Sequence, residues 1–233
     1  ATGRMTLAPM LNERGKLIGD FSLANRGDDT FFIAGSGLAE NYHMRWFRSH
    51  LPADGSVKVD ARGLGLVGLS IAGPKSRDLL QELTDDDVSN EAFKFLDIRS
   101  MNVGMAPCLV GRVSFTGDLG YEIWMEPEHQ RHVFDQLLAH GEAYAVGLFG
   151  SRALNALRVE KNFGSWAREY RPVYGPYEAG MGRFVALKKE ADFIGKSAAA
   201  VEKEQGGKLR LRAFVVEATD ADAIGDEPIW FDG

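Results

Sequence analysis

The stretch Ser114-Phe-Thr-Gly-Asp-Leu-Gly-Tyr-Glu122 decides how the middle of this chain folds. Apolar and β-branched residues precede it, from Leu109 to Val113, and follow it, from Tyr121 to Trp124, which is typical of two strands joined by a turn. Gly117 and Gly120 allow the positive φ angles that such a connection uses. The stretch therefore predicts a hairpin that presents one carboxylate, Glu122, from the start of its second strand.

The chemistry of Glu122 follows from that position. A carboxylate held in a fixed place offers two acceptor oxygens side by side. Adjacent N–H donors on a flat heterocycle, such as a pterin, match this geometry. Glu122 is therefore a candidate binding residue for such a ring.

A second carboxylate, Asp20, stands at a predicted turn-to-strand junction between Ile18-Gly19 and Phe21. Apolar neighbours exclude water from it, which raises the pKa of a carboxyl group and suits it to proton transfer or to stabilising a nearby cation. The local sequence by itself favours a turn aspartate that caps its own backbone. Both interpretations stay open at this point.

Composition excludes several classes of protein. The chain has 233 residues and a net charge of −6, which argues against nucleic acid as a partner because phosphates need a cationic surface. No apolar run approaches the ~20 residues of a membrane span, so we expect no membrane partner. The single cysteine, Cys108, rules out an internal disulfide framework and favours a reducing compartment, which we take to be the cytoplasm. Its apolar surroundings predict a buried thiol.

Other motifs carry little weight. Gly63-Leu-Gly-Leu-Val-Gly68 matches GxGxxG, but its glycines run directly into an apolar strand, so a nucleotide-binding loop is disfavoured. His129 and His132 approach metal-ligand spacing, yet no pattern of Cys, Asp or Glu completes a zinc site, and we predict no metal. No GxSxG elbow occurs and Cys108 has no evident His partner, so covalent hydrolase chemistry is unsupported.

Strand and helix signals alternate irregularly along the chain, which favours an α+β fold with mainly antiparallel sheets and flanking helices over a doubly wound parallel sheet. Besides the hairpin, the predicted strands span 21–24, 31–34, 57–59, 64–72, 179–187 and 209–217. The predicted helices span 38–51, 74–83, 127–138, 153–160 and 196–204. The segment 163–177 is aromatic, basic and rich in Pro and Gly, which indicates a long loop over a surface or cleft.

The two ends predict that the sequence is a piece of a longer protein. Residues 228–231 have the composition of a strand, and Asp232-Gly233 is a strong hairpin signal with no return strand after it. The chain also begins Ala1-Thr2-Gly3 rather than with Met.

Several segments, taken in order, resemble the folate-binding aminomethyltransferase family, which includes the T-protein of the glycine cleavage system. The resemblance covers essentially the whole chain. It rests on Met10-Leu-Asn-Glu-Arg-Gly15 running into Gly19-Asp20, on Gly73-Pro74, on Phe115 to Glu122, and on Leu157-Arg-Val-Glu160, Tyr177-Glu-Ala-Gly180 and Asp192-Phe-Ile-Gly-Lys196.

Within the family, the chain is most similar to the C-terminal half of dimethylglycine and sarcosine dehydrogenases, through 91–96, 153–161 and Ser165-Trp166. Leu154 and Asn155 stand where the glycine-cleavage branch has Arg-Asp. The resemblance implies a tetrahydrofolate-binding part that captures an oxidised N-methyl group as 5,10-methylenetetrahydrofolate. The full-length chain would carry a covalently linked flavin domain with FAD, which this part does not bind. The alternatives are a stand-alone aminomethyltransferase or folate-dependent demethylase, and a non-catalytic folate-binding module.

The resemblance also implies a domain plan and a set of site residues. Residues 1–208 would form a T-protein-like folate-binding region of two interleaved α+β subdomains, with its N-terminal part missing. Residues 209–233 would begin a C-terminal β-barrel subdomain that is largely missing. Asp20 would be the catalytic residue beside the reactive nitrogens of tetrahydrofolate, and Glu122 would bind the pterin. The remaining cofactor-binding residues would be Ser22, Gly35 and Phe115, the last standing where many members have Tyr.

Overall fold

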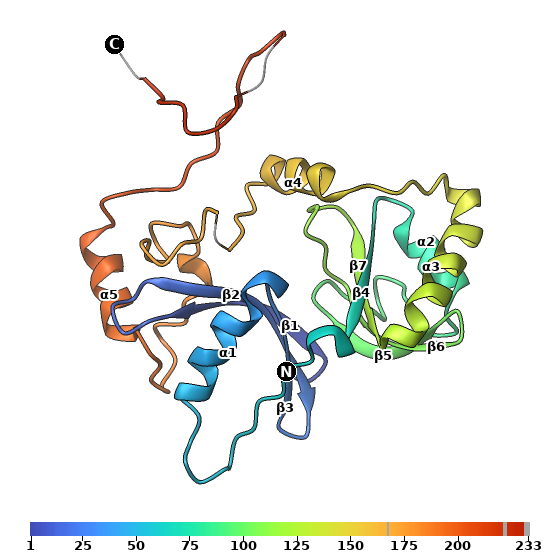
Figure 1. Ribbon diagram of the computed structural model, residues 1–233, viewed down its shortest axis with the longest axis horizontal. Helices are drawn as coiled ribbons and strands as arrows, with labels where there is room; N and C mark the ends of the chain where they lie inside the picture. Colours follow the sequence, from blue (N-terminus) through green and yellow to red (C-terminus); the bar gives the residue numbers. More distant parts are fainter. Residues whose placement is uncertain (167, 221–222, 231–233) are drawn as a thin grey trace.

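The computed structural model describes residues 1–166, 168–220 and 223–230. Two antiparallel sheets lie side by side, each with helices next to it (Figure 1). The N-terminal sheet has three strands in the order β1-β2-β3, and the central sheet has four in the order β4-β7-β6-β5. This is the α+β arrangement that the sequence predicts.

The N-terminal sheet is a meander of β1 (Arg4–Leu11), β2 (Leu17–Gly27) and β3 (Thr30–Ala34). The β1–β2 turn is closed by Asn12, whose side-chain oxygen accepts hydrogen bonds from the Arg14 and Lys16 amides at 3.0 Å each. The predicted pairing of 21–24 with 31–34 is confirmed, with Ser22 opposite Ala34 and Ala24 opposite Phe32.

Helix α1 (Glu40–Ser49) covers one face of this sheet. Phe21 of β2 packs against His43 and Phe47 of the helix, with ring centroids 4.8 Å and 5.7 Å apart. Because side chains alternate along a strand, Phe21 faces α1 while Asp20 and Ser22 face the other side of the sheet.

The central sheet contains β4 (Val67–Ala72), β5 (Ile98–Val103), β6 (Ala106–Gly111) and β7 (Gly120–Met125). Helices α2 (Ser76–Glu82) and α3 (Pro127–Gly141) pack against it and bury the largest apolar cluster of the described residues. The predicted hairpin is confirmed, because β6 pairs with β7 in antiparallel fashion.

The two sheets meet through a smaller apolar cluster. Met5, Ala24 and Ile98 are buried there, and Phe32 and Trp124 pack against them. Backbone hydrogen bonds reinforce the junction, because the Met5 amide donates to the Leu96 carbonyl at 2.7 Å. The sheets are therefore held in a defined relation to each other.

Helix α4 (Ser151–Glu160) lies above the junction, and α5 (Lys196–Gln205) lies beside the β1–β2 turn (Figure 1). Gly15 in that turn has a φ of +71°, and a Cβ there would lie 2.9 Å from the Cβ of Ala198 in α5. Glycine is therefore required at this turn both for its backbone angle and for the close approach of the helix.

Three predicted strands are wrong. The structure has no strand at 57–59, 179–187 or 209–217, all of which lie among its described residues, and a 3-10 helix spans Gly182–Phe184. Val57, Val215 and Val216 are exposed, which shows that β-forming side chains without a partner strand do not make a sheet. The strand predicted at 64–72 begins only at Val67, after a 3-10 turn at Gly63–Gly65.

The strand predicted at 228–231 and the hairpin signal at Asp232-Gly233 lie partly outside the described residues, because the structure does not describe 231–233. Residues 228–230 are exposed and form no strand. Among the described residues, no helix has the length and apolar character needed to cross a membrane.

Candidate functional site

Glu122 is the third residue of β7, where it lies opposite Ser70 of β4 and Gly111 of β6. The hairpin predicts Glu122 at the start of the second strand, and the structure places it third of six residues in β7, between β4 and β6. Burial raises the pKa of Glu122 to about 7. Among the described residues no group donates a hydrogen bond to its carboxyl oxygens. A desolvated carboxyl group without a partner is costly to fold and is typical of a binding site.

Asp20 lies inside β2, opposite Pro9 of β1, rather than at a turn-to-strand junction. The strand begins earlier than the apolar pattern indicates because β1 pairs with it as far back as Leu17. Burial raises the pKa of Asp20 to about 6, and contact with its own backbone opposes this by a smaller amount. The expected desolvation of this carboxyl group is therefore present.

Strand periodicity turns both carboxylates toward the junction of the sheets. Asp20 and Ala24 share one face of β2, and Ala24 belongs to the junction cluster. Glu122 and Trp124 share one face of β7, and Trp124 packs edge-on against Phe32 of β3 with ring centroids 5.0 Å apart. The two acidic residues thus project from facing surfaces of the two sheets.

The loop after α4 contacts both sides of this junction. Phe163 stacks on Phe115 of the β6–β7 connection, with ring centroids 6.3 Å apart and 16° between the planes. The next residue, Gly164, packs on the ring of Tyr170, since a Cβ there would lie 2.4 Å from the Tyr170 Cζ atom. Tyr170 is close enough to Asp20 for the aspartate charge to contribute to raising the pKa of the phenol, although burial is the largest cause. A chain of neighbours therefore connects Phe115 with Asp20.

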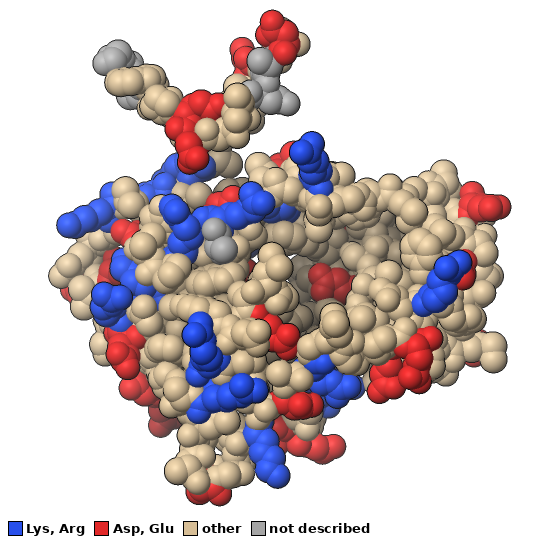
Figure 2. All heavy atoms as spheres, viewed as in Figure 1, with Lys and Arg blue, Asp and Glu red and all other residues tan. Residues whose placement is uncertain are grey.

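Figure 2 shows a hollow near the centre of the molecule, with acidic side chains at its floor and edge. In Figure 1 the same place lies between β2 and α1 on one side and β4 and β7 on the other, below α4. Asp20 belongs to the first of these two sheets and Glu122 to the second.

The other predicted site residues lie on β2, just after β3 and in the β6–β7 connection. Ser22 is half-buried and shares the Asp20 face of β2. Gly35 follows β3, and a Cβ there would meet the Phe21 ring at 2.6 Å and the Asp20 carbonyl oxygen at 3.8 Å. Glycine at 35 is therefore explained by packing on Phe21 beside the backbone of Asp20. The Phe115 ring is 37 % exposed.

Residues in the 158–170 region were not predicted as site residues. Arg158 of α4 is buried, and its guanidinium donates to Glu169 at 2.8 Å, to the Phe163 carbonyl at 2.9 Å and to Asn155 at 2.7 and 3.1 Å. The sequence signal was available, because Arg158 lies in a family-like motif and 163–177 is an aromatic loop predicted to cover a cleft. Only the fold shows that Phe163 and Tyr170 belong to that loop's inner side.

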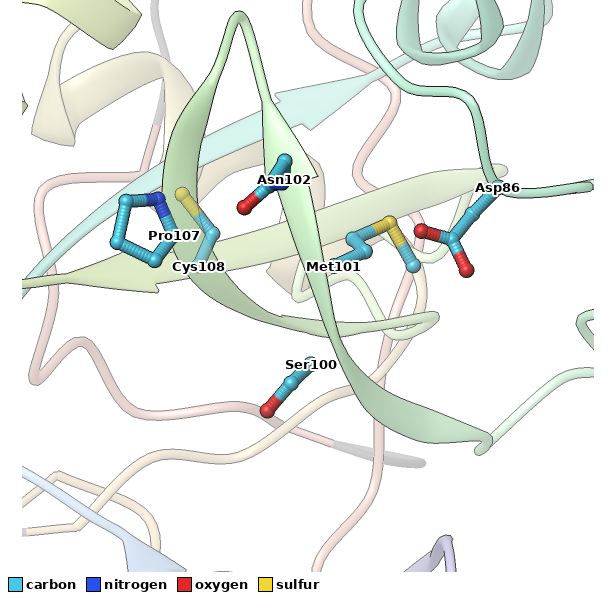
Figure 3. A pocket seen from close by; sticks show the side chains of 6 residues that line it. All are labelled: Asp86, Ser100, Met101, Asn102, Pro107 and Cys108. Carbon is cyan, nitrogen blue, oxygen red and sulfur yellow. The ribbon is translucent and has the colours of Figure 1, made fainter.

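A second hollow, of about 430 Å³, lies along the β5–β6 hairpin of the central sheet. Figure 3 shows five of its side chains spread along the hairpin, Ser100, Met101, Asn102, Pro107 and Cys108, and a sixth, Asp86, on the connection between α2 and β5. None of them is a predicted site residue. Cys108 is buried, as predicted, and burial raises the pKa of its thiol to about 11. The thiol is therefore protonated and poorly nucleophilic near neutral pH.

Comparison with known proteins finds two kinds of relative, a dehydrogenase and an aminomethyltransferase. The chain is 37% identical over 237 residues to mitochondrial dimethylglycine dehydrogenase of Mus musculus, covering 99% of this chain and 27% of that protein. It is 30% identical over 210 residues to aminomethyltransferase of Bacillus subtilis, covering 90% of this chain and 57% of that protein. The chain thus spans about a quarter of the first relative and just over half of the second.

A solved structure confirms the fold. The glycine cleavage system aminomethyltransferase T from Bartonella henselae superposes with a TM-score of 0.74 at 20% sequence identity, covering 88% of this chain and 54% of that one. The predicted T-protein-like fold is therefore present. The family model described as the GCVT N-terminal domain matches residues 1–189, and the chain belongs to this family.

Proposed function

We propose that this chain binds tetrahydrofolate in the central hollow and forms the one-carbon-transfer part of a dimethylglycine- or sarcosine-dehydrogenase-like protein. The observation that carries the proposal is the pair of desolvated carboxyl groups, Asp20 and Glu122, which project from facing surfaces of two different sheets. Membership of the GCVT N-terminal domain family and the similarity to dimethylglycine dehydrogenase support it.

The residues fit a reduced folate. Glu122 has two free acceptor oxygens for adjacent N–H donors of the pterin, and its pKa near 7 leaves it able to accept or share a proton. Phe115 offers a partly exposed aromatic face on which a flat ring can stack. These groups supply the two kinds of contact that a pterin needs, in-plane hydrogen bonds and stacking.

Asp20 is the proposed catalytic residue. Tetrahydrofolate supplies the nucleophilic amine that takes up the one-carbon unit, giving 5,10-methylenetetrahydrofolate. A carboxylate beside that amine stabilises positive charge and accepts the released proton, and a pKa of about 6 keeps most of the group ionised near neutral pH. The enclosing sheets hold the reactants together and limit loss of the one-carbon unit to water.

The oxidation that produces the one-carbon unit would belong to a flavin domain with FAD elsewhere in the longer protein. The chain spans 27% of the mouse dehydrogenase, so most of that relative lies outside the matched region. We further propose a cytoplasmic location, on the basis of the single buried cysteine.

A stand-alone aminomethyltransferase is the second candidate, and its support is the 30% identity to the Bacillus subtilis enzyme. Asn155, which stands where the glycine-cleavage branch has Asp, accepts two hydrogen bonds from Arg158 within α4. An aspartate would accept the same bonds, so the two candidates are separated by experiment. A non-catalytic folate-binding module is the third candidate.

The decisive experiment replaces Asp20 by Asn in the full-length protein. We expect the formation of methylenetetrahydrofolate from tetrahydrofolate and a methylated amine, with the flavin of the full-length protein as oxidant and an added electron acceptor to reoxidise it, to slow by about 10²- to 10⁴-fold, the usual contribution of a general base. Tetrahydrofolate affinity, measured by calorimetry, should change little. Asp60→Asn, at a side chain that is 85% exposed, is the matched control.

The possible outcomes separate the three candidate functions and include one that contradicts the proposal. Unchanged turnover in Asp20→Asn contradicts the catalytic role and leaves the binding module. Turnover that depends on a lipoyl protein rather than on a flavin favours the aminomethyltransferase. A wild-type protein that does not bind tetrahydrofolate contradicts the proposal altogether.

A further inference from the structure

The connection between β6 and β7, which carries Phe115, is held from outside by residues that follow α4. Gly117 in this connection has a φ of +76°, and a Cβ there would lie 2.4 Å from the Lys161 Cγ atom. Lys161 also forms an ion pair with Asp118 at 3.4 Å. The connection therefore packs against the end of α4. Lys161 contacts Gly117 and Asp118, and Phe163 contacts Phe115.

Within the connection, short hydrogen bonds fix the backbone on either side of Phe115. The Ser114 and Thr116 hydroxyl groups are 2.7 Å apart, and the Thr116 amide donates to the Ser114 hydroxyl at 3.2 Å. Thr116 is buried although it is polar. These contacts orient the backbone but leave the Phe115 ring itself with one aromatic neighbour among the described residues, Phe163.

Phe163 is in turn fixed by α4. Its amide donates to the Arg158 carbonyl at 2.9 Å, and its carbonyl accepts from the Arg158 guanidinium at 2.9 Å. The same guanidinium pairs with Glu169, which accepts a hydrogen bond from the Ser165 amide at 3.0 Å. Arg158 therefore holds both the start and the middle of the loop, which fixes the backbone from which the Phe163 ring projects.

We propose that Phe163 is a positioning residue that holds the Phe115 ring flat for stacking against a pterin. This inference rests on the proposed function and deepens it. The Phe163 ring lies beside the Phe115 ring with nearly parallel planes and a centroid separation of 6.3 Å, and Phe115 remains partly exposed for a ligand. A Phe115 ring without that support has free rotation about its side-chain bonds, and a ligand then has to order it at an entropic cost.

The test compares Phe163→Ala with wild type in the full-length protein, using calorimetric titration with tetrahydrofolate. We expect about a fivefold loss of affinity, the scale of one aromatic pair. Phe163→Tyr keeps a stacking ring and should restore the affinity. Phe95→Ala removes a phenylalanine ring that is 63% exposed and serves as the matched control, expected to bind as wild type does.

A second ligand separates positioning from general damage to the fold. p-Aminobenzoylglutamate lacks the pterin, so its binding should be the same in Phe163→Ala and wild type. Equal loss for both ligands, or no loss for tetrahydrofolate, would overturn the role of Phe163. A wild-type protein that binds neither ligand contradicts the proposed function itself, which distinguishes the two failures.

Discussion

Phe32 of β3 and Trp124 of β7 meet edge to face, with ring centroids 5.0 Å apart and 63° between their planes. Trp124 is two residues from Glu122 on the same face of β7, and Phe32 lies opposite Ala24, which shares the Asp20 face of β2. This aromatic contact therefore sets how the two acidic residues lie relative to each other.

Replacement of Trp124 by Ala is expected to weaken that junction. Loss of the ring contact and the cavity it leaves should lower the free energy of unfolding by about 3 kcal/mol, as measured by urea denaturation. Tetrahydrofolate affinity should fall as well, because Glu122 then moves relative to Asp20. Trp230→Ala, at a side chain 80% exposed, should leave both quantities unchanged. Equal stability of the two variants would contradict the role of Trp124.

Replacement of Glu122 by Gln keeps the size of the side chain but removes its charge and one acceptor oxygen. Hydrogen bonds to an ionised group contribute about 1.5–3 kcal/mol, so tetrahydrofolate affinity should fall on the order of tenfold or more. Calorimetric titration measures this directly. Glu128→Gln on the exposed surface of α3 is the matched control. Full affinity in Glu122→Gln would rule out the pterin contact.

The two carboxyl groups also predict a pH dependence of stability. Folding raises the pKa of Asp20 from 3.8 to about 6 and that of Glu122 from 4.5 to about 7, in both cases through burial. The folded protein thus binds protons more strongly than the unfolded chain. The contribution of each group to stability is fully present below pH 4 and is lost as the pH rises through 6 and 7.

The double variant Asp20→Asn/Glu122→Gln isolates this effect, because it keeps both groups neutral at every pH. We expect the variant to gain stability over wild type as the pH rises from 4 to 8, on the order of 2–3 kcal/mol for each carboxyl group. Urea denaturation at several pH values in the absence of ligand measures the difference. A difference that does not change with pH would show that the carboxyl groups are hydrated.

Local patterns predicted much of the secondary structure. The hairpin before Glu122, the pairing of 21–24 with 31–34 and all five longer helices follow from alternation, helical periodicity and turn glycines. The failures share one cause. Strands at 57–59 and 209–217 need a neighbouring strand to accept their backbone hydrogen bonds, and sequence composition does not show whether one is present.

The sequence by itself determined the fold class, the family, the two acidic residues and the apolar setting that desolvates Asp20. Only the tertiary structure decided that Asp20 and Glu122 project from facing surfaces of the two sheets and that Phe163, held by Arg158, lies beside Phe115. The physical reason is the range of the interactions involved. Side-chain periodicity and turn chemistry act over a few residues, whereas the contacts of Phe32 with Trp124 and of Phe115 with Phe163 join segments far apart in the chain.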